Sequence, residues 1–330
     1  MDDVARRAGV SRALVSLVMR ESPKVSNARR AAVIAAATEL GYRPNVLARN
    51  LASHRTQTVG VLIDDLHNQY FAEVMEGIEL HGKARGYRVL MNTSFDRDGG
   101  DRAALETLLE FRTDGLILLG PRLPDDHILA AAEEVPVVCV GRALPSETVD
   151  TVNNDEIAGA RAVVQHLVGH GHRDIAHIDG GDGAGAQTRR DGYEQAMGAH
   201  GLADFVRVVE GDFTEVSGVE AATEMIRWVR RPTAVFAAND LTAAGALDRF
   251  EEEGLRAPAD ISIVGYDNTA LAAMQHMSLS TVDQPRFEMG KLALQSLIER
   301  LESSRTSARH EVLEPQLVPR ATSGPPASGN

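Results

Sequence analysis

The sequence predicts an α/β protein in which a small all-α head precedes a larger domain of parallel sheets flanked by helices. Helix patterns ended by glycines fill the first 42 residues, whereas short apolar strand candidates alternate with helical stretches from Thr58 onward. The balance of charge also changes between these two parts. With 330 residues, of which 43% are hydrophobic, the chain is long enough for two or three globular domains.

Three short helices are predicted in the head, over residues 2–8, 12–19 and 27–40. Gly9 ends the first helix, and Ser11 is a favourable N-cap for the second. Gly41 ends the third helix at a C′ position. Two short helices joined by a tight glycine turn are typical of a helix-turn-helix.

The larger part alternates strand and helix patterns. Apolar strand candidates occupy residues 59–63, 88–91, 115–119, 135–140, 174–178, 234–237, 262–266 and 313–318. Helical stretches lie between most of them, including 71–85, 102–111, 158–170 and 241–253. This order predicts parallel sheets with helices on both faces, and ligands on such sheets bind beyond the carboxyl ends of the strands.

Charge separates the head from the body. Residues 1–55 contain ten Lys and Arg residues but only four Asp and Glu residues, whereas the remainder contains 24 bases and 43 acids. A small basic head on an acidic body predicts that only the head meets a polyanion. Taken alone, the charge would favour an ordinary solvated basic surface over a DNA-binding head.

Composition argues against export, a membrane anchor and a disulfide framework. No apolar h-region follows the charged start of the chain, and no apolar run is long enough to span a bilayer. The single cysteine, Cys139, lies in an apolar run and is interpreted as a buried strand residue. We therefore expect a cytoplasmic protein.

No set of residues predicts catalysis, a metal site or a cofactor. His166, His170 and His172 have a spacing that zinc could use, but the third lies beyond Gly171 and off the helix face. The glycine-rich run 180–185 lacks the features of a dinucleotide or P-loop fingerprint and is interpreted as a mobile loop.

An ordered set of motifs resembles the LacI/GalR family of repressors. The motifs run from the first helix to about Arg320, at residues 3–16, 25–26, 40–45, 57–61, 238–240, 260–268 and 281–285. The resemblance implies a helix-turn-helix head and a two-lobed, periplasmic-binding-protein-like body. Members of the family usually have a few more residues, including a hydroxyl cap, before the first helix. The natural chain is therefore expected either to begin slightly upstream of Met1 or to lack that cap.

The resemblance assigns DNA contacts to the head. The second helix would lie in the major groove, with Arg12 and Ala13 facing base edges. Four polar side chains would position the head on phosphates: Ser11, Ser16, Tyr42 and Asn45. The family often has Arg where this chain has Leu17, so Leu17 is expected either to contact a thymine methyl or to pack in the core.

A short helix predicted over 46–52, after Pro44, resembles the hinge helix of the family. In that case Ala48 and Leu51 enter the minor groove as a dimer pair, beside Arg49, and Leu51 wedges between base steps. The alternative is an ordinary linker helix. Because so short a helix is marginal in water, we expect it to form on DNA binding.

Ten residues of the body are expected to contact a small polar effector, by the same resemblance. Arg189, Asn239 and Asp267 would supply polar contacts, and Phe213 a stacking face. The others are Asp65, Tyr70, Phe71, Asp155, Asp240 and Gln284. Each of the Asn and Asp residues is also explained by a turn or a cap.

The resemblance therefore predicts four segments: a head (1–44), a hinge and linker (45–57), an effector-binding and dimerisation domain (58–322) and a disordered tail (323–330). The N-lobe would cover about 58–168 and 286–312, and the C-lobe about 169–285 and 313–322. The partners would be pseudo-palindromic operator DNA, a small effector, by default a sugar, and a second copy of the chain. Whether the effector induces or co-represses stays open.

Two other classes of protein are alternatives to a transcription regulator. A solute-binding protein explains the body but not the basic head. A metabolic enzyme with a doubly wound sheet would need a dinucleotide fingerprint or a catalytic set, and the sequence contains neither.

Overall fold

The computed structural model describes residues 1–19, 22–42, 56–93, 100–303 and 305–327. The chain divides into two compact units, Met1–Thr56 and Gln57–Asn330. The predicted hinge helix lies outside the described residues, and so do its expected DNA contacts, Asn45, Ala48, Arg49 and Leu51.

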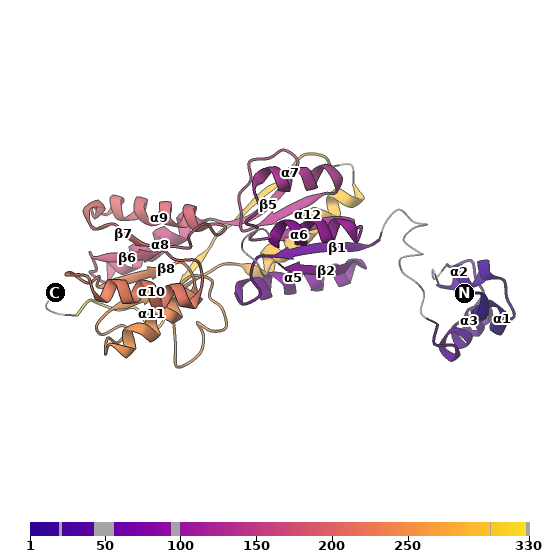
Figure 1. Cartoon of the computed structure of the whole chain (residues 1–330), viewed down its shortest axis with the longest axis horizontal. Helices are drawn as coiled ribbons and strands as arrows, with labels where there is room; N and C mark the ends of the chain where they lie inside the picture. Colours follow the sequence, from indigo (N-terminus) through magenta and orange to yellow (C-terminus); the bar gives the residue numbers. More distant parts are fainter. Residues whose placement is uncertain (20–21, 43–55, 94–99, 304, 328–330) are drawn as a thin grey trace. The chain divides into compact units, whose positions relative to one another are not determined.

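The head is a cluster of three helices, as the sequence predicts (Figure 1). They are α1 (Asp2–Ala8), α2 (Arg12–Met19) and α3 (Asn27–Glu39). Gly9, with φ of 63°, ends α1, and the Ser11 hydroxyl accepts a bond from the Leu14 amide at 3.2 Å. Val15 and Val33 are fully buried where α2 and α3 meet. This small core fixes the angle between the helices and therefore the orientation of the outer face of α2.

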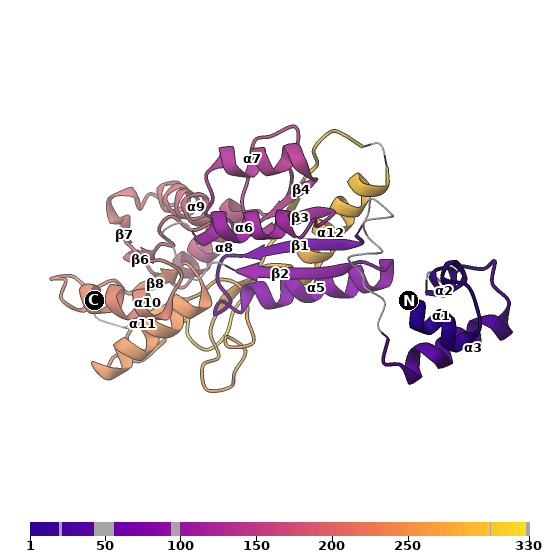
Figure 2. The ribbon, with the colours of Figure 1, turned by 45° about the vertical axis from the view of Figure 1, so that its right-hand side comes forward.

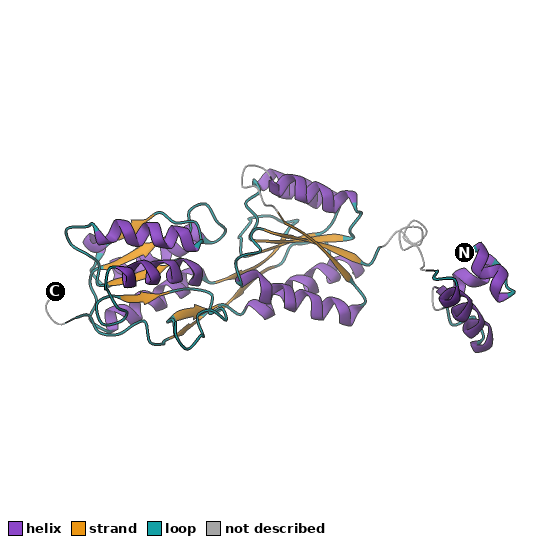
Figure 3. Cartoon of the chain, turned by 60° about the horizontal axis from the view of Figure 1, so that its bottom comes forward, coloured by secondary structure: helices purple, strands orange, loops and turns teal. Residues whose placement is uncertain are grey.

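The N-lobe is built on a parallel six-stranded sheet with the order β11-β5-β4-β3-β1-β2. The strands are β1 (Thr58–Ile63), β2 (Arg88–Thr93), β3 (Gly115–Leu119), β4 (Val137–Val140), β5 (Asp150–Asn154) and β11 (His310–Leu313). Helices α5 (Tyr70–Arg85) and α12 (Arg286–Glu302) cover one face, and α6 (Gly100–Glu110) and α7 (Asp125–Glu134) the other. Figure 2 shows α5 on the opposite side of the sheet from α6 and α7, and Figure 3 shows helices on both faces of the sheet.

The C-lobe repeats this layering on a smaller parallel sheet with the order β7-β6-β8-β9. Its strands are β6 (Ile175–Ile178), β7 (Arg207–Val209), β8 (Ala234–Ala237) and β9 (Ser262–Val264). Helices α8 (Glu156–Gly169) and α9 (Ala186–Ala199) pack on one face, and α10 (Glu215–Ile226) and α11 (Asp240–Glu252) on the other. A short helix, η1 (Ala203–Phe205), precedes β7.

The first crossing between the lobes lies near Asn154, not near residue 168 as expected. Helix α8 belongs to the C-lobe because Val163, Val164 and Leu167 are completely buried in the core that contains Ile175. The apolar face of α8 is therefore buried against the C-lobe sheet.

The strand expected over 313–318 is two strands in different sheets. β11 ends the N-lobe sheet, and β12 (Gln316–Val318) pairs antiparallel with β10 (Thr281–Asp283). Pro315 lies between them, and proline cannot donate a ladder hydrogen bond.

The prediction of a disordered tail from residue 323 is wrong for its first residues. The Ile263 amide donates to the Thr322 carbonyl at 2.8 Å, and the Gly324 carbonyl accepts from the Ser262 hydroxyl at 3.0 Å. Thr322 and Gly324 are buried, and the His166 ring bonds the Ser323 hydroxyl. The small residues of this segment let its backbone lie along β9, so a composition typical of disorder forms an ordered strap instead.

Candidate functional site

A pocket lies between the two lobes, at the carboxyl ends of the N-lobe strands. Asp64 follows β1, Gly120 follows β3 and Gly141 follows β4, so these positions meet at one sheet edge. The full lining is Asp64, Asp65, Asn68, Tyr70, Phe71, Gly120, Arg122, Gly141, Glu156, Ala184, Arg189, Asp212, Phe213, Asp267 and Gln284. The start of α5 brings the aromatic pair of the N-lobe wall, Tyr70 and Phe71, whose ring centroids are 5.1 Å apart.

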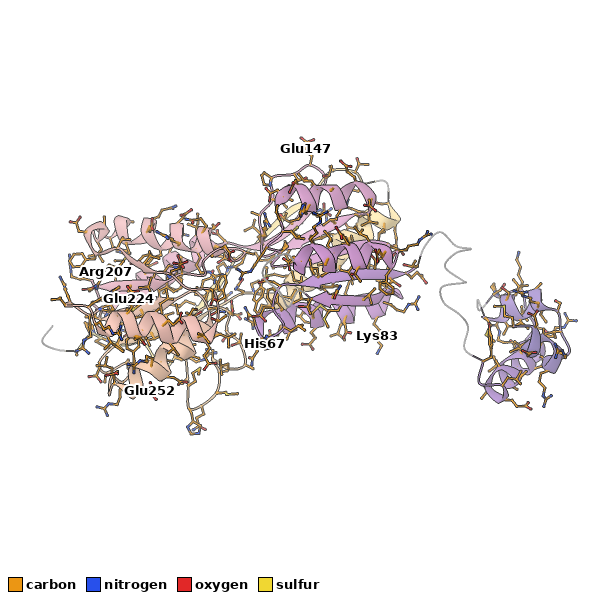
Figure 4. The ribbon with its side chains drawn as sticks, viewed as in Figure 1. His67, Lys83, Glu147, Arg207, Glu224 and Glu252 are labelled. Atoms are coloured by element: carbon orange, nitrogen blue, oxygen red, sulfur yellow. The ribbon has the colours of Figure 1, made fainter. Side chains whose placement is uncertain are left out.

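Two labelled residues in Figure 4 show how α5 runs within the N-lobe. His67, just before the helix, lies at the end of the N-lobe that faces the C-lobe, whereas Lys83, in its last turn, lies toward the other end. The Asp65 carboxylate accepts from the His67 amide at 2.8 Å, which fixes the loop at the rim.

Most of the residues expected to contact an effector line this pocket. They are Asp65, Tyr70, Phe71, Arg189, Phe213, Asp267 and Gln284. Asp155, Asn239 and Asp240 are not in the lining, and each holds a neighbouring element. The Asp155 carboxylate caps α8 at the Ala158 amide, 2.9 Å away.

Asn239 and Asp240 support the pocket from behind. The Asn239 side chain caps α11 at the Thr242 amide, and its Nδ2 donates to the Phe213 carbonyl at 2.9 Å. The Asp240 carboxylate accepts from the Thr269 amide at 2.7 Å. Burial raises the pKa of Asp240 to about 6, although the hydrogen bonds it accepts oppose that shift.

Arg189 is held rigidly in the C-lobe wall. Its side chain is only 4% exposed, and its Nε donates to the Glu156 carboxylate at 2.8 Å. Its guanidinium stacks over the Tyr266 ring, 3.7 Å from the centroid, and also bonds the Ala238 carbonyl. Because the donors are fixed before a ligand arrives, little entropy is lost on binding.

Phe213 owes its position to the glycine-rich loop. It has a φ of 67°, and its ring lies where side chains at Gly180 and Gly183 would stand. A Cβ atom at either glycine would collide with the ring. The glycine-rich loop 180–185, which the sequence predicts to be mobile, is therefore packed against the Phe213 ring.

Asp267 is a buried carboxyl group in an uncommon backbone conformation. Its φ is 114°, its exposed fraction is 3%, and it accepts from the Gln284 amide at 2.6 Å. Burial, followed by the nearby Asp240, raises the pKa of Asp267 well above its usual value, against the opposing influence of Arg189 and Arg286. Strained and electrostatically perturbed residues concentrate at functional sites.

Polar contacts bridge the two lobes around the pocket. Arg122 of the N-lobe pairs with Asp64 at 3.0 Å and with Asp182 of the C-lobe. Near the crossings, the Asn154 amide donates to the Tyr266 hydroxyl at 2.8 Å. These contacts tie the two lobes to each other across the pocket.

Sequence reasoning missed part of the lining: Asp64, Asn68, Gly120, Arg122, Gly141, Glu156, Ala184 and Asp212. Asp64 and Glu156 are immediate neighbours of the predicted Asp65 and Asp155. The signal for Asp64 was the end of the predicted strand 59–63, which it directly follows, whereas no strand was predicted before Glu156. Arg122 also follows a strand end, β3, and the same rule could have found it.

The head presents its expected DNA contacts unevenly. Ser11, Arg12 and Ala13 are exposed at the start of α2, whereas Ser16 and Tyr42 are half-buried. Leu17 is also half-buried and packs against the head core. The exposed start of α2 is therefore the part of this helix best placed to reach base edges.

The histidine and cysteine residues form no metal centre in the described ranges. No group of three His, Cys, Asp or Glu side chains there could hold a metal ion. His172 is buried and bonds Thr233, Ser262 and the tail, and burial lowers its pKa. Cys139 is buried, and burial raises the pKa of its thiol to about 12.

Among the described helices, none has the length and apolarity needed to cross a bilayer.

Two family models match the chain. Residues 1–45 match the lacI family of bacterial regulatory proteins, and residues 164–323 match the periplasmic binding protein-like domain. The chain is 37% identical to the HTH-type transcriptional repressor PurR of Proteus mirabilis, over 96% of this chain and 95% of that protein.

Solved structures give the same relationship. A lac repressor dimer bound to operator and the anti-inducer ONPF superimposes with a TM-score of 0.85, at 29% identity, over 98% of both chains. A complex of the transcriptional regulator CelR with cellobiose superimposes with a TM-score of 0.73, at 34% identity, over 97% of this chain and 98% of that one. With a helix-turn-helix head, an effector-binding body and this extent of similarity, the chain belongs to the lacI family of bacterial transcriptional regulators.

Proposed function

We propose that the protein is a dimeric repressor whose affinity for a pseudo-palindromic operator is set by a sugar-type effector bound between the lobes. The observation that carries this proposal is the pocket, in which Phe71 and Phe213 and the preorganised Arg189 converge from the two lobes. Apolar faces with a few fixed polar groups are typical of small-molecule sites.

The head would read DNA through α2. Arg12 and Ala13 face base edges in the major groove, and the hydroxyls of Ser11, Ser16 and Tyr42 contact phosphates. Two heads related by a two-fold axis would read two half-sites. The hinge would add Asn45, Ala48, Arg49 and Leu51 in and beside the minor groove.

Effector binding would act through lobe closure. A ligand that contacts both walls favours one arrangement of the cross-lobe contacts of Arg122, and in a dimer this arrangement sets the spacing of the two hinges. The coupling must be reciprocal, so operator DNA must change effector affinity by the same factor. The protein would work as a binding protein rather than an enzyme, in the cytoplasm where its DNA lies.

Binding of the full chain to the DNA upstream of its own gene, against random competitor and across a salt series, tests this function. We expect specific binding that resists competitor and weakens steeply with salt. Equal, weak affinity for both DNAs, in the absence and in the presence of the effector, would contradict the proposal, since a co-repressed protein binds its operator only with its effector. Deletion of residues 1–55 separates it from a solute-binding protein or an enzyme, since either would keep its whole function.

A further inference from the structure

The pocket has an excess of negative charge. Arg122 and Arg189 are the bases of its lining, and its acids are Asp64, Asp65, Glu156, Asp212 and Asp267. The acids thus outnumber the bases by five to two. In a cleft shielded from water, such an imbalance acts on a ligand far more strongly than on an open surface.

Both guanidinium groups of the lining already hold carboxylates. Arg189 pairs with Glu156 at 2.8 Å, and Arg122 pairs with Asp64 and Asp182. An entering phosphate or carboxylate would have to compete with these pairs. It would also be repelled by the remaining acids, so an anionic ligand is disfavoured.

Asp267, one of these five acids, responds to charged groups on several elements around the pocket. The groups that bear on it come from several elements: Asp240 on α11, Arg189 on α9, Arg286 on α12 and Tyr70 on α5. Burial and Asp240 outweigh the two arginines, so the pKa of Asp267 is raised well above its usual value. A positive charge on a ligand placed beside this carboxyl group would favour its ionised form and would be attracted to it.

The aromatic side chains of the pocket also suit a ligand that combines a sugar ring with a positively charged group. Tyr70 and Phe71 line the N-lobe side and Phe213 lines the C-lobe side. Aromatic faces stack on the apolar face of a sugar ring and attract an ammonium group. Ionised carboxylates only accept hydrogen bonds, whereas an ammonium group only donates them.

We propose that the effector is a polyhydroxyl ring carrying a protonated amine, such as an amino sugar, and that the pocket excludes phosphorylated sugars. The proposal rests on the assignment of this pocket as the effector site. It adds the charge of the ligand, which the family relationship leaves open.

The test uses matched ligands that share a ring and differ in charge. Glucose, galactose and mannose, each as the neutral sugar, the 2-amino-2-deoxy sugar and the 6-phosphate, are titrated calorimetrically into the full chain at pH 7. For the ring that fits, we expect the amine to bind about tenfold or more tightly than the neutral sugar, and the phosphate about tenfold or more weakly. The tightest ligand is then added to the operator-binding assay.

Two variants locate the effect. Asp65→Asn keeps an oxygen for the His67 amide and removes one charge, so it should reduce the preference for the amine. Asp248→Asn removes an exposed charge of α11 outside the lining and should leave the preference unchanged.

The possible outcomes are distinct. A neutral sugar that equals its amine, or a phosphate that exceeds its neutral sugar, overturns the charge selection and leaves the effector site standing. Binding by none of the nine ligands overturns the proposed ligand class, while the operator assay without effector still decides the DNA-binding function. Tight amine binding with unchanged operator affinity supports the ligand class and contradicts the effector role.

Discussion

Buried charged side chains make the pocket selective but leave it strained. Asp267 keeps its positive φ because Gln284 and the sheet edge hold it in place, whereas burial and the nearby Asp240 raise its pKa. Such a residue contributes little to folding, and we therefore expect its role to lie in ligand binding.

Replacing Asp267 with asparagine tests that role. Asn tolerates positive φ and can still accept from Gln284, so the fold and operator binding should persist. Affinity for the tightest ligand of the sugar panel should fall about tenfold or more, because the carboxylate is lost. Calorimetry measures the ligand, and fluorescence anisotropy measures operator binding. An unchanged effector response would remove Asp267 from the site.

His177 should make the body sensitive to acid. The ring is fully buried against Phe236 and Tyr193, and burial lowers its pKa to about 4 from an ordinary value of 6.5. The unfolded chain therefore binds a proton that the folded chain does not, so stability falls as pH drops from about 6.5 to about 4.

In His177→Phe, the loss of unfolding free energy between pH 6.5 and pH 4 should be smaller by up to about 3 kcal/mol, as expected for a pKa shift of this size in a buried group. Urea unfolding from pH 4 to 7 measures it. The exposed His276 provides the matched control, because His276→Gln should keep the wild-type slope. A slope that is unchanged in His177→Phe would contradict the assignment.

The sequence located side chains that follow strand ends and misjudged those whose role depends on distant partners. Tyr70 and Phe71 were predictable because they follow the first strand of the body, and strand ends mark the ligand edge of a parallel sheet, whereas Phe213 was assigned from the resemblance to the family. Asn239 caps its own helix instead of lining the pocket, a competition between local and long-range hydrogen bonds that a sequence does not resolve.

Among the elements, the glycine-rich loop 180–185 is constrained by the pocket, because side chains at Gly180 and Gly183 would collide with the Phe213 ring. Gly183→Ala should displace the Phe213 ring and weaken binding of the tightest panel sugar about tenfold or more, with a smaller effect on stability. Gly198→Ala, at an exposed position in α9 with open space around it, should leave ligand binding unchanged and add up to about 1 kcal/mol of stability. Calorimetry and urea unfolding of both variants give the comparison. Equal ligand affinities would contradict the claim that Gly183 positions the Phe213 ring.

Elements with continuous apolar runs were predictable, and polar buried ones were not. β3 and β8 match their predicted bounds because their residues are apolar throughout. β5 was missed because Asp150, Thr151 and Asn154 are polar yet buried, with Asp150 held by Arg305 at 2.6 Å. Burial of a charge depends on a partner 155 residues away in the chain.

The complete chain has to transmit a signal from pocket to DNA, and the hinge is the predicted link. Leu51→Ala should weaken specific operator binding about tenfold or more, because the minor-groove wedge is lost. Affinity for the tightest panel sugar, measured by calorimetry, should not change. Gel-shift titration with operator and random DNA provides the measurement, and unchanged operator affinity would remove the wedge from the mechanism.

The C-terminal strap should stabilise the C-lobe as a unit. Deletion of residues 321–330 removes the backbone bond to Ile263 and the contacts with Ser262 and His166. At about 1 kcal/mol for each hydrogen bond, we expect a loss of about 2–4 kcal/mol in urea unfolding. Deletion of 328–330 alone is the control and should cost little, and equal stability of the two variants would contradict a structural role for the strap.

The position of that strap also bears on how copies of the protein meet in a crowded cell. β9 ends the C-lobe sheet order, and Thr322 occupies a backbone amide of Ile263 that another strand could otherwise pair with. An uncovered sheet edge is a template for aggregation. By bonding to β9, Thr322 and Gly324 make this sheet edge less available to a second copy of the chain, so we expect copies to assemble through other surfaces of the body.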